Sequence, residues 1–207
     1  MSANRSIEFF DRQFERQVRE HDLALNPFER TTLPYLHGRV LDFGCGMGNL
    51  AVAAARRGCA VTALDASATA IGHLRALAAQ EGLAIDARQA DLRGYRIEGE
   101  FDTIVSIGLL MFFDCPSAAR SLADIQARVS AGGTAVVNVL IEGTTYLDML
   151  DPGGHCLFAR GELAQRFAQW EVLHSTFDDF SAPGDRNKSF ATVIARKPAA
   201  AARTAAH

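Results

Sequence analysis

The stretch VLDFGCGMGNL, residues 40–50, places three alternate glycines where a short apolar strand gives way to a helix. Glycine has no Cβ, so Gly44, Gly46 and Gly48 can adopt positive φ and let a ligand approach the main chain closely. The stretch therefore predicts a binding loop. A tight strand-to-helix turn without a ligand is the alternative, because glycine-rich turns are common in α/β domains.

Outward from this loop, short apolar or β-branched runs alternate with helical stretches, which is typical of βα units around a parallel sheet. The expected strands are Arg39–Phe43, Ala60–Leu64, Ala84–Gln89, Phe101–Ile107, Thr134–Ile141, Glu171–Phe177 and Ser189–Arg196. The expected helices between them are Asn49–Arg57, Ser67–Glu81, Pro116–Val129 and Arg160–Ala168. Only turn-forming residues, Ser181–Asp185, separate the last two strands, so these should pair antiparallel. The predicted fold class is an α/β, doubly wound, seven-stranded mixed sheet with helices on both faces.

Two helices are expected ahead of the sheet. Apolar residues recur at spacings of three and four in Ser6–His21, and Asn26 is placed to cap a second, shorter helix. The spacing of Phe9, Phe10 and Phe14 favours docking of the first helix on the core. An aromatic lid over an acceptor pocket is the alternative.

The length of 207 residues and a hydrophobic content of 48% fit a single domain with a real core. We expect residues 1–38 to pack on a domain that spans residues 39–197. Residues 198–207, rich in alanine, are expected to form a disordered tail.

The balance of charged residues limits the kinds of partner that the protein can bind. Lys and Arg number 21 against 24 Asp and Glu, a net charge of -3, so no basic nucleic-acid footprint is present. The longest apolar runs, residues 101–113 and 134–141, are shorter than the roughly 18 residues of a membrane span, and the N-terminus has no signal-peptide pattern. We expect a soluble monomer or homodimer that acts on a small molecule, with no nucleic-acid or membrane partner.

The four cysteines, Cys45, Cys59, Cys115 and Cys156, lie far apart and form no Cys-x-x-Cys pair. Their number and spacing indicate neither a disulfide scaffold nor a zinc site, so no metal is expected. The simplest interpretation is a protein of the reducing cytoplasm. Cys45, inside the glycine loop, is expected to be a small packing residue rather than a nucleophile.

Two aspartates end neighbouring strands. Asp65 ends the second strand about 20 residues beyond the loop, where a carboxylate can accept hydrogen bonds from both ribose hydroxyls. Asp91 ends the third. Each aspartate by itself could simply cap the helix or turn that follows it. Together with the loop they predict a nucleoside site at the carboxyl edge of the sheet.

The stretch GMGNLA, residues 46–51, also fits the Gly-x-Gly-x-x-Ala pattern of nicotinamide cofactors. Against that ligand, Asp42 stands just ahead of the glycines, where its charge would repel a pyrophosphate but could hold an ammonium group. A nucleoside joined to an amino acid therefore fits better. An NAD(P)-dependent oxidoreductase and a non-catalytic nucleoside-binding sensor stay open as alternatives.

The stretch LDFGCGMG, residues 41–48, with Asp65 and Asp91 at their spacings, resembles the class I S-adenosylmethionine-dependent methyltransferases over residues 39–197. The resemblance implies a Rossmann-like methyltransferase fold with its last strand antiparallel. It also implies S-adenosyl-L-methionine as methyl donor.

Two further stretches are similar to the tellurite-resistance methyltransferases of that superfamily. They are SIGLLMFF, residues 106–113, and the close of the chain from residues 158–163 through 190–197. This similarity implies a small acceptor, either a soft oxyanion such as tellurite or selenite, or a thiol.

The resemblance also implies the cofactor-binding residues. The backbone of the glycine loop would cradle the methionine part of the cofactor. Asp65 would bind the ribose hydroxyls, and Asp91 and Leu92 would contact the edge of the adenine. The full set is Asp42, Gly44, Cys45, Gly46, Gly48, Asp65, Ala66, Asp91, Leu92, Ser106 and Ile107.

The sequence departs from the tellurite-resistance enzymes in one place. They carry a His-Arg pair between the last two strands, whereas residues 178–185 contain no histidine. Arg186 is a possible stand-in for the arginine, and with Arg160 it could hold an anionic acceptor through bidentate contacts. His155, in the long connection after the fifth strand, is a third acceptor candidate. For all three residues an ordinary surface or loop role is the alternative.

No nucleophile–base pair stands out, so no catalytic residue is identified. Methyl transfer from an activated sulfonium can rest on positioning and desolvation alone.

Overall fold

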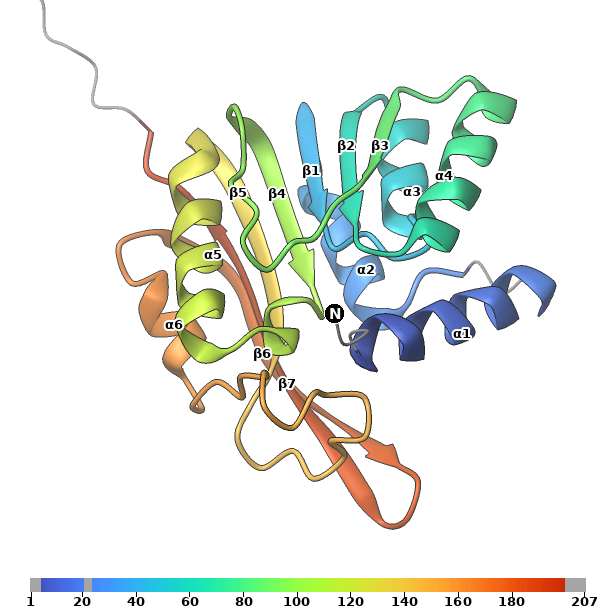
Figure 1. Ribbon diagram of the computed structural model, residues 1–207. Helices are drawn as coiled ribbons and strands as arrows, with labels where there is room; N and C mark the ends of the chain where they lie inside the picture. The colour runs from blue at the N-terminus through green and yellow to red at the C-terminus, as the bar shows by residue number, and fades with distance from the viewer. Residues whose placement is uncertain (1–4, 21–23, 200–207) are drawn as a thin grey trace, which may run out of the picture.

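The computed structural model describes residues 5–20 and 24–199 (Figure 1). The expected tail, apart from its first two residues, and His21 of the first expected helix lie outside the described residues, as does the side chain of Phe9.

The core of the fold is a seven-stranded sheet in the order β3-β2-β1-β4-β5-β7-β6. Its strands are β1 (Arg39–Phe43), β2 (Ala60–Asp65), β3 (Ile85–Gln89), β4 (Phe101–Ile107), β5 (Val129–Leu140), β6 (Glu171–Ala182) and β7 (Arg186–Arg196). The first five are parallel, and β7 runs antiparallel to both β5 and β6. The predicted seven-stranded mixed sheet is confirmed. Because the chain winds outward from β1 in both directions, the strand order reverses between β1 and β4, where such sheets form a ligand crevice.

Helices cover both faces of the sheet. They are α1 (Arg5–Glu20), α2 (Pro27–Thr32), α3 (Asn49–Arg56), α4 (Ala68–Glu81), α5 (Cys115–Arg128) and α6 (Glu162–Arg166), with 3₁₀ turns η1 (Leu33–Tyr35) and η2 (Leu110–Phe112). Leu41 and Phe43 of β1 face the cluster that holds α5 and α6, whereas Val40 faces the cluster of α3 and α4. The alternating side chains of one strand thus serve two cores.

The segment before β1 is tied to the domain by capping and packing. Asn26 caps α2 by accepting a hydrogen bond from the Glu29 backbone, and the Glu29 carboxylate accepts one in return from the Asn26 backbone. This reciprocal capping box starts a helix of only six residues. Leu33 and Leu36, just beyond it, pack against a buried cluster that includes Val105 of β4.

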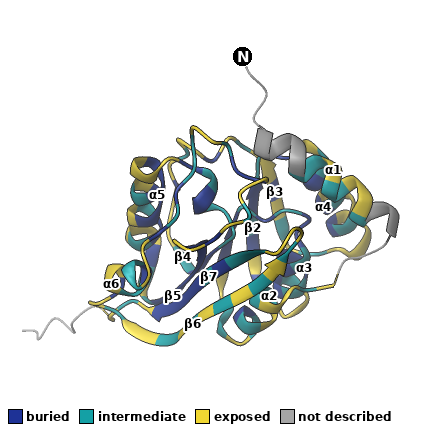
Figure 2. Cartoon of the chain, turned by 90° about the horizontal axis from the view of Figure 1, so that it is seen from below, coloured by how far each residue is buried: buried dark blue, intermediate teal, exposed yellow. Residues whose placement is uncertain are grey.

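The two C-terminal strands are longer than the sequence predicted. They were expected at Glu171–Phe177 and Ser189–Arg196, but β6 continues to Ala182 and β7 begins at Arg186. Their pairing persists to Ala182 opposite Arg186, so only residues 183–185 of the expected Ser181–Asp185 turn connect the two strands. Figure 1 shows this hairpin extending past the carboxyl ends of β1 and β4, toward the end of the molecule where α1 lies. Figure 2 shows β6 as the more exposed edge strand.

Two of the four cysteines form a disulfide. Cys115, at the start of α5, is bonded to Cys156 in the β5–α6 connection, with 41 residues of sequence separation and a Cα–Cα distance of 4.8 Å. The sequence analysis did not predict this bond, because tertiary folding joins residues that the sequence separates. Cys45 and Cys59 are free and buried. No helix within the described ranges is long and apolar enough to cross a membrane.

Candidate functional site

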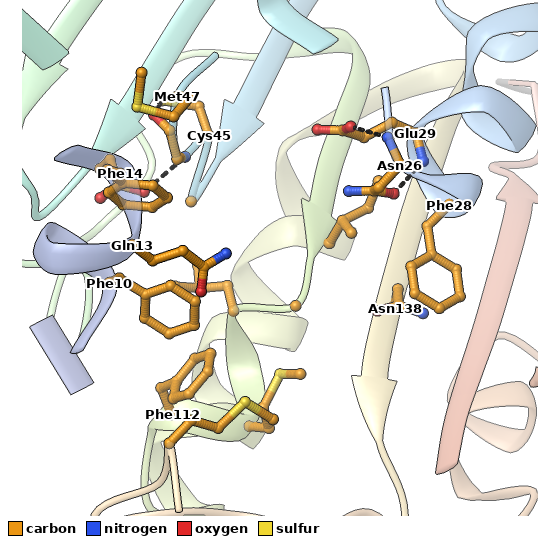
Figure 3. A pocket seen from close by; sticks show the side chains of 18 of the residues that line it. Phe10, Gln13, Phe14, Asn26, Phe28, Glu29, Cys45, Met47, Phe112 and Asn138 are labelled. Carbon is orange, nitrogen blue, oxygen red and sulfur yellow. Dashed lines mark hydrogen bonds between the residues drawn. The ribbon is translucent and has the colours of Figure 1, made fainter. Parts of the chain in front are cut away.

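A cavity of about 740 Å³ lies at the carboxyl ends of the central strands (Figure 3). We call one part of its wall the loop side, formed by the glycine loop and neighbouring strand ends: Asp42, Gly44, Cys45, Gly46, Met47, Asp65, Ala66, Asp91 and Leu92. The other part is the aromatic side, which includes Phe10, Phe28, Phe112, Tyr146, Phe180 and Phe190. Phe14 of α1 lies where the two sides meet, because a Cβ on Gly46 would come within 3.3 Å of its ring.

The glycine loop is held in place by β2. The backbone N–H groups of Gly44 and Cys45 both donate to the Leu64 carbonyl, at 2.9 and 3.0 Å. Gly44, Gly46 and Gly48 all have positive φ, as the sequence predicted. Gly48 serves packing, because it caps α3 and a Cβ there would lie 2.6 Å from the Leu74 side chain. Gly44 and Gly46 border the cavity, so these two leave room for a ligand against the main chain.

Asp65 links the loop to the start of α4. One carboxylate oxygen accepts from the Gly46 N–H at 2.8 Å, and the other accepts from the Ser67 N–H at 2.9 Å. Burial raises the pKa of Asp65, while these backbone donors act to lower it. Each oxygen retains acceptor capacity toward the cavity, which is the requirement for binding two hydroxyl groups.

Asp42 is almost completely buried, with 5% of its surface exposed. Its Oδ2 atom has no hydrogen-bond partner among the described residues. Burial raises its pKa to about 8, and the nearby carboxylates of Glu29 and Asp65 add to the shift. The Asp42 carboxyl is thus a buried hydrogen-bond acceptor that borders the cavity and lies near other carboxylates. Such a group is suited to binding a cationic group of a ligand.

Most of the remaining predicted cofactor residues also border the cavity. Ala66, Asp91 and Leu92 lie in its wall, as does Ile107. Ser106 does not: it is fully buried on β4, so the wall begins one residue later than expected. For Cys45, burial raises the pKa of its thiol well above the usual range, which agrees with a packing role. The binding roles of these residues stay predictions.

The three acceptor candidates lie elsewhere within the described part of the chain. His155 hydrogen-bonds through Nδ1 to the Asp151 carbonyl at 2.7 Å. The Arg160 guanidinium stacks 4.4 Å from the centroid of the exposed Phe177 ring. Arg186 forms a bidentate pair with Asp148, at 2.7 and 2.9 Å. The structure therefore does not bring them together at the cavity wall.

Sequence reasoning missed several residues that do border the cavity. Glu29 and Lys188 are the charged residues of the aromatic side that the structure describes. Asn138 of β5 contributes a buried amide, whose Nδ2 donates to Thr192 at 2.9 Å. The Asn26–Glu29 capping pattern could have placed Glu29 at a helix start, but no local pattern indicates that it faces a cavity.

Helix α1 crosses the mouth of the loop side. Besides the contact of Phe14 with Gly46, Asp11 accepts a hydrogen bond from the Ser67 hydroxyl, next to Asp65. Phe10 meets the Phe112 ring edge-on, with centroids 5.1 Å apart. The first helix is thus both docked on the domain and part of the cavity wall, so the two alternatives raised for its aromatic residues are compatible.

The disulfide lies directly behind the aromatic side. The Cys156 N–H donates to the Met111 carbonyl at 3.1 Å, and Met111 borders the cavity. Cys115 follows η2 within a few residues, so the bond ties η2 to the β5–α6 connection. Both segments contribute to the wall.

Comparison with known proteins identifies relatives. Residues 40–133 match the family described as a methyltransferase domain. The chain is 28% identical over 170 residues to the probable S-adenosyl-L-methionine-dependent methyltransferase TehB of Haemophilus influenzae, covering 77% of this chain and 57% of that protein. It is also 28% identical to hemagglutinin 1 of Eikenella corrodens, covering 77% and 55%. The chain thus spans little more than half the length of these relatives.

Solved structures share the fold. The crystal structure of Haemophilus influenzae TehB superposes with a TM-score of 0.72 at 23% identity, covering 84% of this chain and 63% of that one. The N-methyltransferase NodS of Bradyrhizobium japonicum, solved with S-adenosyl-L-homocysteine, gives a TM-score of 0.64 at 18% identity, covering 91% and 98%. The predicted fold class and the resemblance to class I and tellurite-resistance methyltransferases are confirmed.

Proposed function

We propose that this chain, which has the fold and the domain signature of class I methyltransferases, transfers a methyl group from S-adenosylmethionine to a small acceptor. The observation that carries the proposal is the buried Oδ2 of Asp42, which has no partner among the described residues. It borders the same cavity as the glycine loop and Asp65. An ammonium acceptor and a hydroxyl acceptor in one cavity match a nucleoside joined to an amino acid.

The residues present fit this cofactor. Gly46 and Gly44 leave the main chain bare at positions where any Cβ would be strained and would press on Phe14 or Leu109. Asp42 supplies the charge for an ammonium group, and Asp65 supplies two oxygens already oriented by backbone donors. A pyrophosphate would instead meet the carboxylates of Asp42 and Asp65, which does not favour the oxidoreductase alternative.

When bound, S-adenosylmethionine supplies a methyl group whose bond to sulfur breaks as the acceptor's lone pair bonds to carbon, leaving a neutral thioether and releasing the acceptor's proton. The protein's contribution is to bind, orient and exclude water. Phe14 and Phe112 shield the region between the loop and the acceptor, and the Asp65 carboxylate fixes the loop. Positioning of this kind can account for a large part of a transfer rate without a dedicated base.

The acceptor class is the finer part of the proposal: a soft nucleophile, either a chalcogen oxyanion such as tellurite or selenite, or a thiol. The cavity supports the thiol more than the oxyanion. Arg160 stacks on the exposed Phe177, and Arg186 is paired with Asp148 and stacks on Tyr146 at the edge of the cavity. Among the described charged residues that border the cavity, the acidic Glu29, Asp42, Asp65 and Asp91 outnumber the basic Arg93 and Lys188. A compact anion would therefore gain little net attraction.

The partner in this proposal is a small molecule, not a nucleic acid or a membrane, and the protein acts as a monomer or homodimer. The weak net charge of -3 supports the absence of steering toward a polyanion.

Calorimetric titration with S-adenosylhomocysteine and with NADH, followed by an assay of S-adenosylhomocysteine release across an acceptor panel, tests the function. We expect binding of the first ligand only, and turnover with at least one small nucleophile. Binding of NADH alone would favour the oxidoreductase. Binding of S-adenosylhomocysteine without turnover of any acceptor would favour a sensor.

A further inference from the structure

We infer that the acceptor is a small aromatic compound that carries its nucleophilic O–H or S–H group on the ring or on the adjoining carbon. The inference rests on the proposed function and names the substrate class of the same cavity.

Two clusters of phenylalanine rings form the aromatic side. In the first, Phe10 lies 5.8 Å from Phe14 and 5.1 Å from Phe112, measured between ring centroids. These rings come from α1 and η2. Their spacings fall in the range at which aromatic side chains attract one another by tilted or edge-to-face contact.

The second cluster joins α2 to the C-terminal hairpin. Phe28 lies 5.6 Å from Phe180 and 5.0 Å from Phe190, and the last two are 5.8 Å apart. All three rings border the cavity. Figure 3 shows Phe28 across the open space from Phe10, Phe14 and Phe112. A flat apolar molecule between the two clusters would extend the ring-to-ring contacts on both sides.

One polar group in this wall is left for a ligand. The Oδ1 atom of Asn138 is buried and has no partner among the described residues, although Nδ2 of the same amide is bound to Thr192. Asn138 borders the same cavity as Phe28 (Figure 3). A buried amide oxygen without a donor is unfavourable, so an O–H, N–H or S–H group on an aromatic acceptor would satisfy it and orient the ring.

The same wall disfavours a bare oxyanion. Such an ion would lose its hydration shell against ring faces that carry partial negative charge. Lys188, whose Nζ lies 5.7 Å from the Tyr146 centroid, is the cation of this side among the described residues, and the half-buried carboxyl of Glu29 borders the same space. Apolar walls with few convergent polar groups are typical of sites for organic ligands.

The test compares two alkanethiols of similar acidity, phenylmethanethiol and 2-mercaptoethanol, together with selenite. We expect kcat/KM for the aromatic thiol to exceed that for either other acceptor by about tenfold or more. Phe180→Ala should lower kcat/KM for phenylmethanethiol about tenfold, with a change of less than about twofold for 2-mercaptoethanol and in the Kd of S-adenosylhomocysteine.

Phe177→Ala is the matched control, because Phe177 lies on the same strand but is exposed and outside the cavity wall. This substitution should leave kcat/KM unchanged for all three acceptors. If S-adenosylhomocysteine binds but phenylmethanethiol is turned over no better than 2-mercaptoethanol or selenite, the aromatic acceptor is wrong whereas the methyltransferase proposal stands. Absence of S-adenosylhomocysteine binding would overturn the proposed function itself.

Discussion

The loop side and the aromatic side of the cavity are assembled in different ways. The loop side comes from three strand ends between residues 42 and 92, each next to its neighbour in the sheet. The aromatic side comes from α1, α2, η2, the β5–α6 connection and the C-terminal hairpin, between residues 10 and 190. A binding surface made of backbone and strand ends depends on local sequence, whereas one made of side chains from distant segments depends on how those segments pack.

The largest expected effect is on the loop side. Gly46→Val should weaken S-adenosylhomocysteine binding by about 100-fold or more, since a β-branched residue at a φ of +51° is strained and its side chain would fill the ligand's space beside Phe14. Calorimetry measures the loss. Gly99→Val is the control, because Gly99 also has positive φ but is exposed with open space around it. Similar loss in both variants would show that strain alone, not the ligand cradle, is responsible.

The next largest effect is expected from removing the disulfide that lies behind the aromatic side. Replacing Cys115 and Cys156 by serine should lower the free energy of unfolding by about 2–4 kcal/mol, because the bond closes a long loop in the unfolded chain. Urea denaturation with and without dithiothreitol measures it. S-adenosylhomocysteine affinity should change less than about twofold, because the bond supports only the aromatic side. A midpoint that dithiothreitol does not alter in the wild type would contradict the prediction.

Asp65→Asn tests the loop side more finely. It should weaken cofactor affinity by about 1.5–3 kcal/mol, the range for hydrogen bonds to a charged group. The variant keeps the shape of the side chain but loses the charge that accepts from Gly46 and Ser67. Asp86→Asn, at an exposed position on the adjacent strand β3, should have no effect on the measured Kd. Equal affinities of Asp65→Asn and the wild type would remove Asp65 from the site.

The pKa of Asp42 leads to a prediction about protons. Since this pKa is raised to about 8, the carboxyl is mostly protonated at pH 7 in the free protein, and a bound ammonium would favour its ionised form. Cofactor binding at pH 7 should therefore release close to one proton, which titrations in buffers of different ionisation enthalpy can measure. Asp42→Asn should abolish the release and weaken binding about tenfold.

The same shift affects stability. A carboxyl whose pKa is higher in the folded than in the unfolded state makes the free protein less stable as pH rises from its ordinary pKa toward 8. Asp42→Asn should flatten that part of the stability profile. A wild-type profile that is already flat across this window would argue that Asp42 is ionised without a ligand.

The smallest effect is expected for Arg186→Ala. Because Arg186 pairs with Asp148 at the surface and lies outside the cavity wall, stability should change by less than about 1 kcal/mol and kcat/KM by less than about twofold. Steady-state kinetics with a thiol and with selenite measure this. A selective rise in KM for selenite would return Arg186 to the acceptor site.

The fold could be predicted because its signals are local. Five parallel strands were placed within a few residues of their ends by apolar runs and flanking turns, apart from the early start of β5. The glycine loop indicated where the ligand crevice opens. The extension of β6 to Ala182 was missed since its outer part is polar and half exposed, and pairing with Arg186–Ser189 rather than local hydrophobicity holds it in the sheet.

For the acceptor side, sequence reasoning selected arginines by their chemistry and could not know their direction. Arg160 turns outward onto Phe177, and Arg186 turns to Asp148, because register and loop packing decide what each side chain meets. The disulfide between Cys115 and Cys156 was also missed for this reason, since only the docking of the β5–α6 connection on η2 brings the two residues within bonding distance.

The sequence by itself determined the sheet, the bare main chain of the glycine loop and the carboxylates at the strand ends, because each depends on residues close together in the chain. The tertiary structure alone decided the two phenylalanine clusters, the placement of Glu29, Lys188 and Asn138 in one wall, and the disulfide behind it. The physical reason is that backbone conformation and strand direction follow local sterics and hydrogen bonding, whereas contacts between distant segments form only when the whole chain has buried its core.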